Sequence, residues 1–175
     1  MDSKISKKWL TKLILIMAVF ILVASALSCT CSSPPNPTPP ESNKAPDFTL
    51  STLAGDEITL SELEGPVVLN FWATWCVYCA EEMRYFNAVA KQSADEITVV
   101  AIDVGQDASK VKQYFGDYEI SFTVALDEDS HVASMYAVRY FPTTFFIDSE
   151  GVIRNRKIGA FRSEMELWDS LRGLS

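Results

Sequence analysis

The hydrophobic and polar positions alternate between strand and helix periods from residue 45 onward. Nearly unbroken apolar runs at residues 67–72 and 97–102 are typical of strands that are buried on both faces. Shorter apolar runs that are paired across glycine-containing turns predict two β-hairpins. The expected strands are therefore residues 48–50, 58–60, 67–72, 97–102, 122–126, 143–147 and 152–158.

Apolar residues at helical spacing separate several of these strands. A helix is expected to begin near Cys76 and to continue to about Lys91, and two shorter helices are expected at residues 107–118 and 131–138. Strands that alternate with helices, followed by a hairpin and a last helix, predict an α/β sandwich with a mixed central sheet.

Two segments have the spacing of a capping box, in which a Ser and a Glu three residues later satisfy the first N–H groups of a helix. Ser61 and Glu64 predict a short helix, and Ser163 and Glu166 predict the last helix of the chain. The last helix is expected to place its apolar side chains on one face, namely Met165, Trp168 and Leu171.

Residues 1–31 have the pattern of an export leader. Four lysines precede an uncharged apolar run at residues 13–27, as in the basic and hydrophobic regions of a signal peptide. A helix of that length rises about 22 Å, which is short of a hydrocarbon core of about 30 Å. Ser28 before Cys29 resembles a loose lipobox, so Cys29 is the expected lipidation site. An uncleaved anchor and cleavage after Ala26 are the alternatives, and each of them exports the rest of the chain.

Composition and charge describe the part of the chain beyond the leader. Residues 32–44 read SSPPNPTPPESNK and should form an extended spacer, which leaves residues 45–175 as one domain, expected to be a monomer. Hydrophobic residues make up 48% of the chain, which is typical of a folded protein. The net charge of −8 argues against nucleic-acid binding, because a phosphate backbone requires clustered lysines and arginines.

The candidate chemistry lies at Cys76 and Cys79, where a buried strand ends and a helix begins. A helix N-terminus carries partial positive charge and free N–H groups, which favour a thiolate at Cys76. Cys79 lies one turn later on the same face and can close a disulfide with Cys76. Zinc binding would need a second ligand pair, and no metal site is expected. An inert structural disulfide stays open as an alternative, since export permits one.

The segment at residues 67–82, with Trp75, Cys76, Cys79 and Glu82 at its end, resembles the thioredoxin superfamily when it is taken with the segment at residues 141–148. More narrowly it resembles the TlpA/ResA-like, membrane-tethered thiol–disulfide oxidoreductases. The resemblance implies a thioredoxin fold, with a mixed central sheet flanked by helices, an N-terminal β-hairpin and an inserted helix at residues 107–118.

The resemblance also implies roles for single residues. Pro142 matches the cis-proline that faces the dithiol; an ordinary trans-proline at the start of an edge strand is the alternative. Glu82 matches an acid near the thiols that could accept a proton from Cys79, and a solvated helix glutamate is its alternative. Trp75 matches the aromatic residue that lines the substrate groove. The other residues expected to contact the substrate are Tyr78, Phe141 and Thr143.

Two departures from the family pattern bear on proton handling and on the direction of electron flow. Asn70 stands where cytosolic thioredoxins carry a buried aspartate. Tyr78 replaces the proline that often precedes the second cysteine, and so restores an N–H that could stabilise a sulfur anion.

The function that this resemblance implies is reduction of protein disulfides on the extracytoplasmic face of a bacterial membrane. No cofactor beyond the Cys76–Cys79 disulfide is expected. Electrons would come from a membrane dithiol carrier of the CcdA/DsbD type, and apocytochrome c is the substrate class suggested. Tyr78 keeps a dithiol oxidase or isomerase open. A peroxidase is disfavoured because Ala73 stands where peroxiredoxins carry threonine, and a copper-handling module is disfavoured by the two-residue gap between the cysteines.

Overall fold

The computed structural model describes residues 43–93 and 96–174, which contain a mixed five-stranded sheet. The strand order is β5-β4-β3-β6-β7, in which β3, β4 and β5 are parallel and β6 and β7 are antiparallel to their neighbours. The strands are β3 (Val67–Trp72), β4 (Thr98–Val104), β5 (Thr123–Asp127), β6 (Thr143–Ile147) and β7 (Ile153–Ile158). The predicted mixed α/β architecture is therefore confirmed.

The central strand β3 positions the functional site. All six of its residues are buried, as its apolar run predicts, because helices or a hairpin cover both of its faces. Val68 and Trp72 point into the core cluster under the long helix, while Leu69 and Phe71 belong to the cluster on the opposite face. The strand ends at Trp72, and the chain passes directly into the segment that carries the cysteines.

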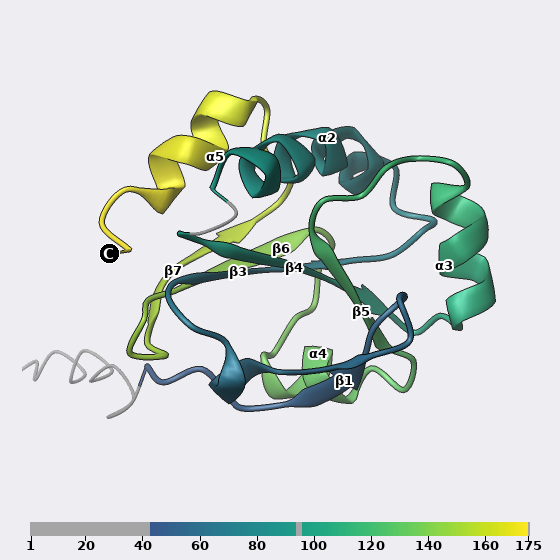
Figure 1. Ribbon diagram of the computed structural model, residues 1–175, viewed down its shortest axis with the longest axis horizontal. Helices are drawn as coiled ribbons and strands as arrows, with labels where there is room; N and C mark the ends of the chain where they lie inside the picture. The colour runs from purple at the N-terminus through teal and green to yellow at the C-terminus, as the bar shows by residue number, and fades with distance from the viewer. Residues whose placement is uncertain (1–42, 94–95, 175) are drawn as a thin grey trace, which may run out of the picture. The chain divides into compact units, whose positions relative to one another are not determined.

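Three helices cover one face of the sheet. They are α2 (Val77–Gln92), α3 (Ala108–Phe115) and α5 (Glu164–Leu171), and Figure 1 shows α2 and α5 side by side above the strands. Phe86 of α2, Phe115 of α3 and Leu167 of α5 meet in one core cluster. The inserted helix ends earlier than the predicted residue 118, because Gly116 adopts a positive φ of 52° and stops it.

A hairpin and two short helices cover the other face (Figure 1). The hairpin pairs β1 (Thr49–Ser51) with β2 (Glu57–Thr59) in a separate two-stranded sheet, as predicted within one residue. The 3-10 helix η2 (Leu60–Glu62) follows the hairpin, and α4 (His131–Met135) precedes β6. Phe48, Ile58 and Tyr136 belong to this second core cluster.

Two sequence predictions about helices are wrong. Ser61 caps no helix: its N–H and hydroxyl both donate to the carboxylate of Asp47, so only a three-residue 3-10 turn forms there. In α5 the capping by Ser163 is confirmed, and Leu171 and Trp168 do pack against the core. Met165 is the error: it is 72% exposed, and Leu167 is buried instead. The buried face of α5 is therefore rotated relative to the predicted face, because Leu167 and Leu171, four residues apart, pack against the core together.

The predicted leader at residues 1–31, its lipidation site Cys29 and the linker at residues 32–44 lie wholly or almost wholly outside the described residues. These boundaries stay predictions. Within residues 43–93 and 96–174, no helix is both long enough and apolar enough to cross a bilayer.

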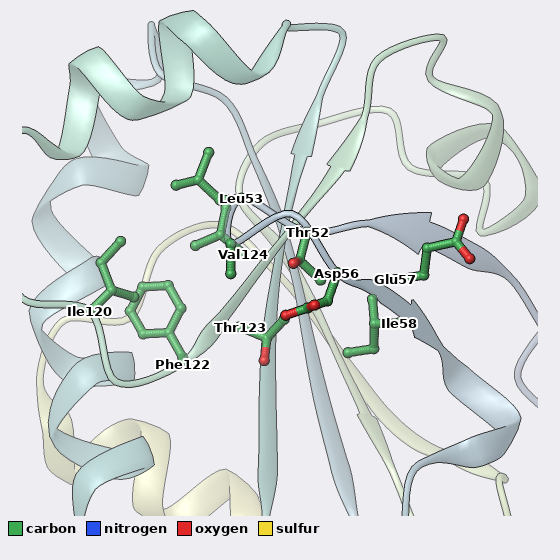
Figure 2. Close-up of a pocket in the computed structure, with 10 residues that line it drawn as sticks. Thr52, Leu53, Asp56, Glu57, Ile58, Ile120, Phe122, Thr123 and Val124 are labelled. Atoms are coloured by element: carbon green, nitrogen blue, oxygen red, sulfur yellow. The ribbon is translucent and has the colours of Figure 1, made fainter.

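The hairpin also closes the outer edge of the sheet at β5. The Leu53 N–H donates to the Val124 carbonyl at 2.8 Å, and Thr52 forms an isolated bridge with Ala125. A pocket of about 510 Å³ lies beside this junction, with apolar side chains such as Ile120 and Phe122 grouped together (Figure 2). Neither Cys76 nor Cys79 lines this pocket, so the site predicted at the two cysteines lies elsewhere.

Candidate active site

The active-site loop connects the end of β3 to the start of α2. Cys76 is the N-cap of α2 and its N–H donates to the Ala73 carbonyl at 3.0 Å, which forms a tight turn. The Thr74 N–H donates to Oε1 of Gln106 at 2.8 Å, so the segment between β4 and α3 holds this loop from the side. The strand end, the cap and the Gln106 contact together fix Cys76 at the positive end of a helix dipole.

Cys76 and Cys79 form a disulfide, with an S–S distance of 2.06 Å. Cys76 is 7% exposed and Cys79 is fully buried, so the outer sulfur of the disulfide belongs to Cys76. The backbone N–H that reaches Cys76 Sγ is that of Cys79, at 3.2 Å. Tyr78 was the predicted source of such a donor, but the first helical turn aims the Cys79 N–H at the cap sulfur instead.

Pro142 follows a cis peptide bond with Phe141, so the trans alternative is wrong. Pro142 and Phe141 line the same groove as Tyr78, and the Gly159 N–H donates to the Pro142 carbonyl. Thr143 is 3% exposed and its hydroxyl donates to the Tyr140 carbonyl at 2.7 Å. Its hydroxyl is therefore engaged inside the protein, and its backbone lies in β6 between β3 and β7, so the geometry gives the predicted substrate contact of Thr143 no support.

Large hydrophobic side chains are exposed in the segments beside the disulfide and Pro142. Trp75 is 66% exposed and its ring lies 5.6 Å from that of Phe141, which links the cysteine loop to the cis-proline loop. The other exposed side chains of this rim are Val77, Tyr78 and Tyr140. Clustered exposed apolar side chains mark a surface that contacts another molecule.

Glu82 is fully buried behind the dithiol, so the solvated-helix alternative is wrong. Its Oε1 accepts from Asn70 Nδ2 at 3.0 Å and its Oε2 accepts from the Phe161 N–H at 2.8 Å. Asn70 Nδ2 also donates to Thr144 Oγ1 at 3.1 Å. Asn70 of β3 and the Phe161 backbone thus hold the Glu82 carboxyl one helical turn beyond Cys79, and Thr144 of β6 fixes Asn70.

Burial raises the pKa of Glu82 to about 7, and the hydrogen bonds from Phe161 and Asn70 lower it only partly. Near neutral pH this carboxyl therefore exchanges readily between its charged and neutral forms. A buried carboxyl with such a pKa can take a proton from a neighbouring thiol and return it.

Asp103 is a second buried carboxyl, and the sequence pattern did not single it out. It stands opposite Trp72 in the β3–β4 register, and neither carboxylate oxygen has a hydrogen-bond partner among the described residues. Burial, and secondly the charge of Asp107, raise its pKa to about 7. The sequence did contain a signal, because an acidic residue lies within the apolar run of β4. The predicted strand ended at residue 102, one residue before Asp103.

A disulfide at a helix N-terminus, a cis-proline beside it and a buried carboxyl behind it define a thiol–disulfide oxidoreductase with a thioredoxin fold. The chain belongs to the AhpC/TSA family, whose sequence profile matches residues 42–156.

Named relatives agree with this class. The chain is 35% identical to the thioredoxin-like protein YneN of Bacillus subtilis over 131 residues, which cover 72% of this chain and 76% of YneN. It is 36% identical over 118 residues to the thiol-disulfide oxidoreductase ResA of Bacillus cereus, with 66% of this chain and 68% of ResA covered. The crystal structure of the exposed lipoprotein thioredoxin Etrx1 of Streptococcus pneumoniae superposes with a TM-score of 0.66 at 27% identity, with 73% of this chain and 98% of Etrx1 covered. The predicted fold and ResA-like resemblance are confirmed.

Proposed function

We propose that this oxidoreductase reduces disulfides in other proteins on the extracytoplasmic face of the membrane. The observation that carries the proposal is the exposed rim of Trp75, Val77, Tyr78 and Tyr140 beside a disulfide whose outer sulfur belongs to Cys76. A small-molecule disulfide would not require a wide apolar surface, whereas an extended polypeptide would bury it on docking.

In the reduced protein, the Cys76 thiolate attacks one sulfur of a substrate disulfide. A mixed disulfide forms with that sulfur, and the other substrate sulfur leaves as a thiolate that takes up a proton. Cys79 then loses its proton to Glu82 and attacks Cys76 Sγ, which releases the second substrate thiol and closes the Cys76–Cys79 disulfide. Two electrons pass from the dithiol of this protein to the substrate disulfide.

The oxidised protein requires a new pair of electrons after each cycle. A membrane dithiol carrier of the CcdA/DsbD type would supply them by the same exchange in reverse, and apocytochrome c is the proposed substrate class. Location outside the membrane, with a tether at lipidated Cys29 or at an uncleaved leader, is supported by the leader pattern and by the likeness to Etrx1, which is named an exposed lipoprotein.

One feature of the site favours electron flow in the opposite direction, from substrate thiols to the Cys76–Cys79 disulfide. The Cys79 N–H and the start of α2 both stabilise a thiolate at Cys76, which favours the reduced form and makes a disulfide a stronger oxidant. Glu82 acts against this, because an ionised carboxyl near the dithiol disfavours thiolates. We assign the reducing direction because the buried carboxyl lies one turn from Cys79, and an oxidase or isomerase is the second candidate.

The exchange mechanism is tested by trapping. The full chain with Cys79→Ser, expressed in a bacterial envelope, should accumulate mixed disulfides on Cys76, because no second thiol near Cys76 remains to release the partner. Bands that shift on a non-reducing gel and disappear with dithiothreitol are the expected result. The matched control is the Cys76→Ser, Cys79→Ser double variant, which should trap nothing. Absence of any partner on Cys79→Ser would contradict the mechanism.

A further inference from the structure

A groove of about 540 Å³ runs beside the cis-proline loop, between α2 and the segment after β7. Its lining includes Tyr78, Arg84 and Tyr85 from α2, Pro142, and Arg162 from the opposite wall. The groove therefore lies where a polypeptide bound at the apolar rim would continue past its reactive cysteine. Any role of this groove in choosing polypeptides rests on the proposed function.

Two arginines on opposite walls of this groove are joined through one tyrosine. Nη2 of Arg84 donates to the Tyr85 hydroxyl at 2.9 Å, and the guanidinium lies over the Tyr85 ring at 4.9 Å. The same hydroxyl donates to the Arg162 carbonyl at 3.2 Å. The Tyr85 ring thus holds the Arg84 charge in place and fixes the backbone that carries Arg162, so little side-chain entropy is left to lose when an anion binds Arg84.

The positive charge of these arginines is only partly balanced inside the protein. Neither Arg84 nor Arg162 forms an ion pair within residues 43–93 and 96–174, although other arginines and lysines there do. Glu81 attracts Arg84, and Glu166 attracts Arg162, without a close ion pair in either case. Glu166 is also paired with Lys157 at 3.0 Å, and Glu81 is the single carboxylate in the lining, so the two arginines leave the groove with a net positive charge. A locally cationic groove in a chain of net charge −8 points to an anionic ligand.

We propose that this groove selects substrate polypeptides that carry an aspartate or glutamate within a few residues of the reactive cysteine. An extended chain advances about 3.3 Å per residue, so a carboxylate two to four residues from a sulfur at Cys76 reaches the groove. Guanidinium groups bind carboxylates through paired N–H donors, which suits the exposed ends of Arg84 and Arg162. The acidic body repels such partners at long range, and the two arginines supply the local attraction.

The test uses the reduced full chain and two peptides that contain a disulfide and differ at one position, aspartate or lysine, three residues from the cysteine. Each rate is divided by the rate of the same peptide with dithiothreitol, which removes differences in intrinsic reactivity. We expect the aspartate peptide to react about three- to tenfold faster at low salt, since exposed ion pairs contribute modestly. Added salt should reduce this ratio.

The Arg84→Gln, Arg162→Gln double variant should bring the ratio near one, while Arg84→Lys, which keeps the charge, should retain part of it. Arg156→Gln is the matched control, because Arg156 is exposed on β7 and lies outside the groove. Equal rates for the two peptides with the unaltered protein would overturn the inference while leaving the proposed function in place. If the unaltered protein reduced neither peptide, the proposed function would fall and the inference with it.

Discussion

Replacing Glu82 with glutamine tests the proton transfer most specifically. The structure accommodates the amide, because Asn70 Oδ1 has no partner among the described residues and Asn70 can rotate by half a turn. In the rotated state Oδ1 would accept from the Gln side chain and from the Thr144 hydroxyl, while the new Oε1 would still accept from Phe161 N–H. The substitution therefore removes the titratable group and keeps the hydrogen-bonded connection between α2 and the sheet.

The expected effect on the thiols is a Coulomb interaction. Side chains three residues apart in a helix are separated by about 5–6 Å, and an effective dielectric constant of about 20 gives roughly 3 kcal/mol between two unit charges. This corresponds to a rise of up to about 2 units in the pKa of Cys79 when Glu82 is ionised. Above pH 7, Glu82→Gln should therefore lower the Cys79 pKa by about 1–2 units. It should also slow exchange about tenfold, because the proton acceptor is lost.

The same variant should change the pH dependence of stability. Glu82 keeps its proton to about pH 7 in the fold, whereas its ordinary pKa is 4.5. Below pH 4.5, Glu82 therefore does not lower the free energy of unfolding. The loss grows between pH 4.5 and 7, and above pH 7 it reaches at most about 3 kcal/mol. Glu82→Gln should remove that loss, so its stability relative to the unaltered protein should improve between pH 5 and pH 8.

The assay combines the ultraviolet absorbance of thiolates during a pH titration of the reduced protein with the rate of exchange with a peptide disulfide. Chemical unfolding at pH 5 and pH 8 gives the stability. Glu64→Gln, at an exposed position before β3, is the matched control and should change none of the three readings. Thiol titration and rate that are unchanged in Glu82→Gln would refute the assigned role and leave Glu82 as a structural carboxyl.

Three further predictions concern a second buried acid, the order of thiol reactivity and the domain boundary. Asp103→Asn should be more stable than the unaltered protein at pH 8, by up to about 4 kcal/mol, and equal to it near pH 4. The reason is that the pKa of Asp103 in the fold, about 7, lies above its ordinary value of 3.8. Equal unfolding midpoints of the two proteins at both pH values would contradict this prediction. Limited alkylation of the reduced protein at neutral pH should label Cys76 before the fully buried Cys79, and peptide mapping that finds Cys79 first would reverse their roles. A fragment of residues 45–175 should be soluble and monomeric by sedimentation, whereas an unfolded product would move the predicted boundary.

Much of the fold was predictable because its signals are local. The unbroken apolar run of β3 predicted a strand that is buried on both faces, and the glycine-containing turn between β6 and β7 predicted their hairpin. The family resemblance of residues 141–148 implied a cis-proline at Pro142, and the cis bond is there.

The missed features depend on contacts between residues far apart in the sequence. Ser61 has the local pattern of a cap, but Asp47, fourteen residues earlier, takes both of its hydrogen bonds. Burial of Glu82 results from its contact with the Phe161 backbone, 79 residues away, which no periodicity reports. Asp103 was missed because the predicted strand ended one residue before it, and the neighbouring strands that bury it are not adjacent in the sequence. Polar groups that tertiary packing buries are the part of a site that a single sequence reports least.

The central claim is that this dithiol donates electrons to protein disulfides, and its reduction potential tests that claim most directly. The protein is equilibrated with glutathione buffers of known ratio, and the Cys76–Cys79 disulfide is quantified after acid quenching and alkylation. We expect a potential near or below about −220 mV, in the range of reductants such as glutaredoxins and thioredoxin. A value near −120 mV, that of a strong dithiol oxidant, would contradict the proposed direction and establish the oxidase alternative.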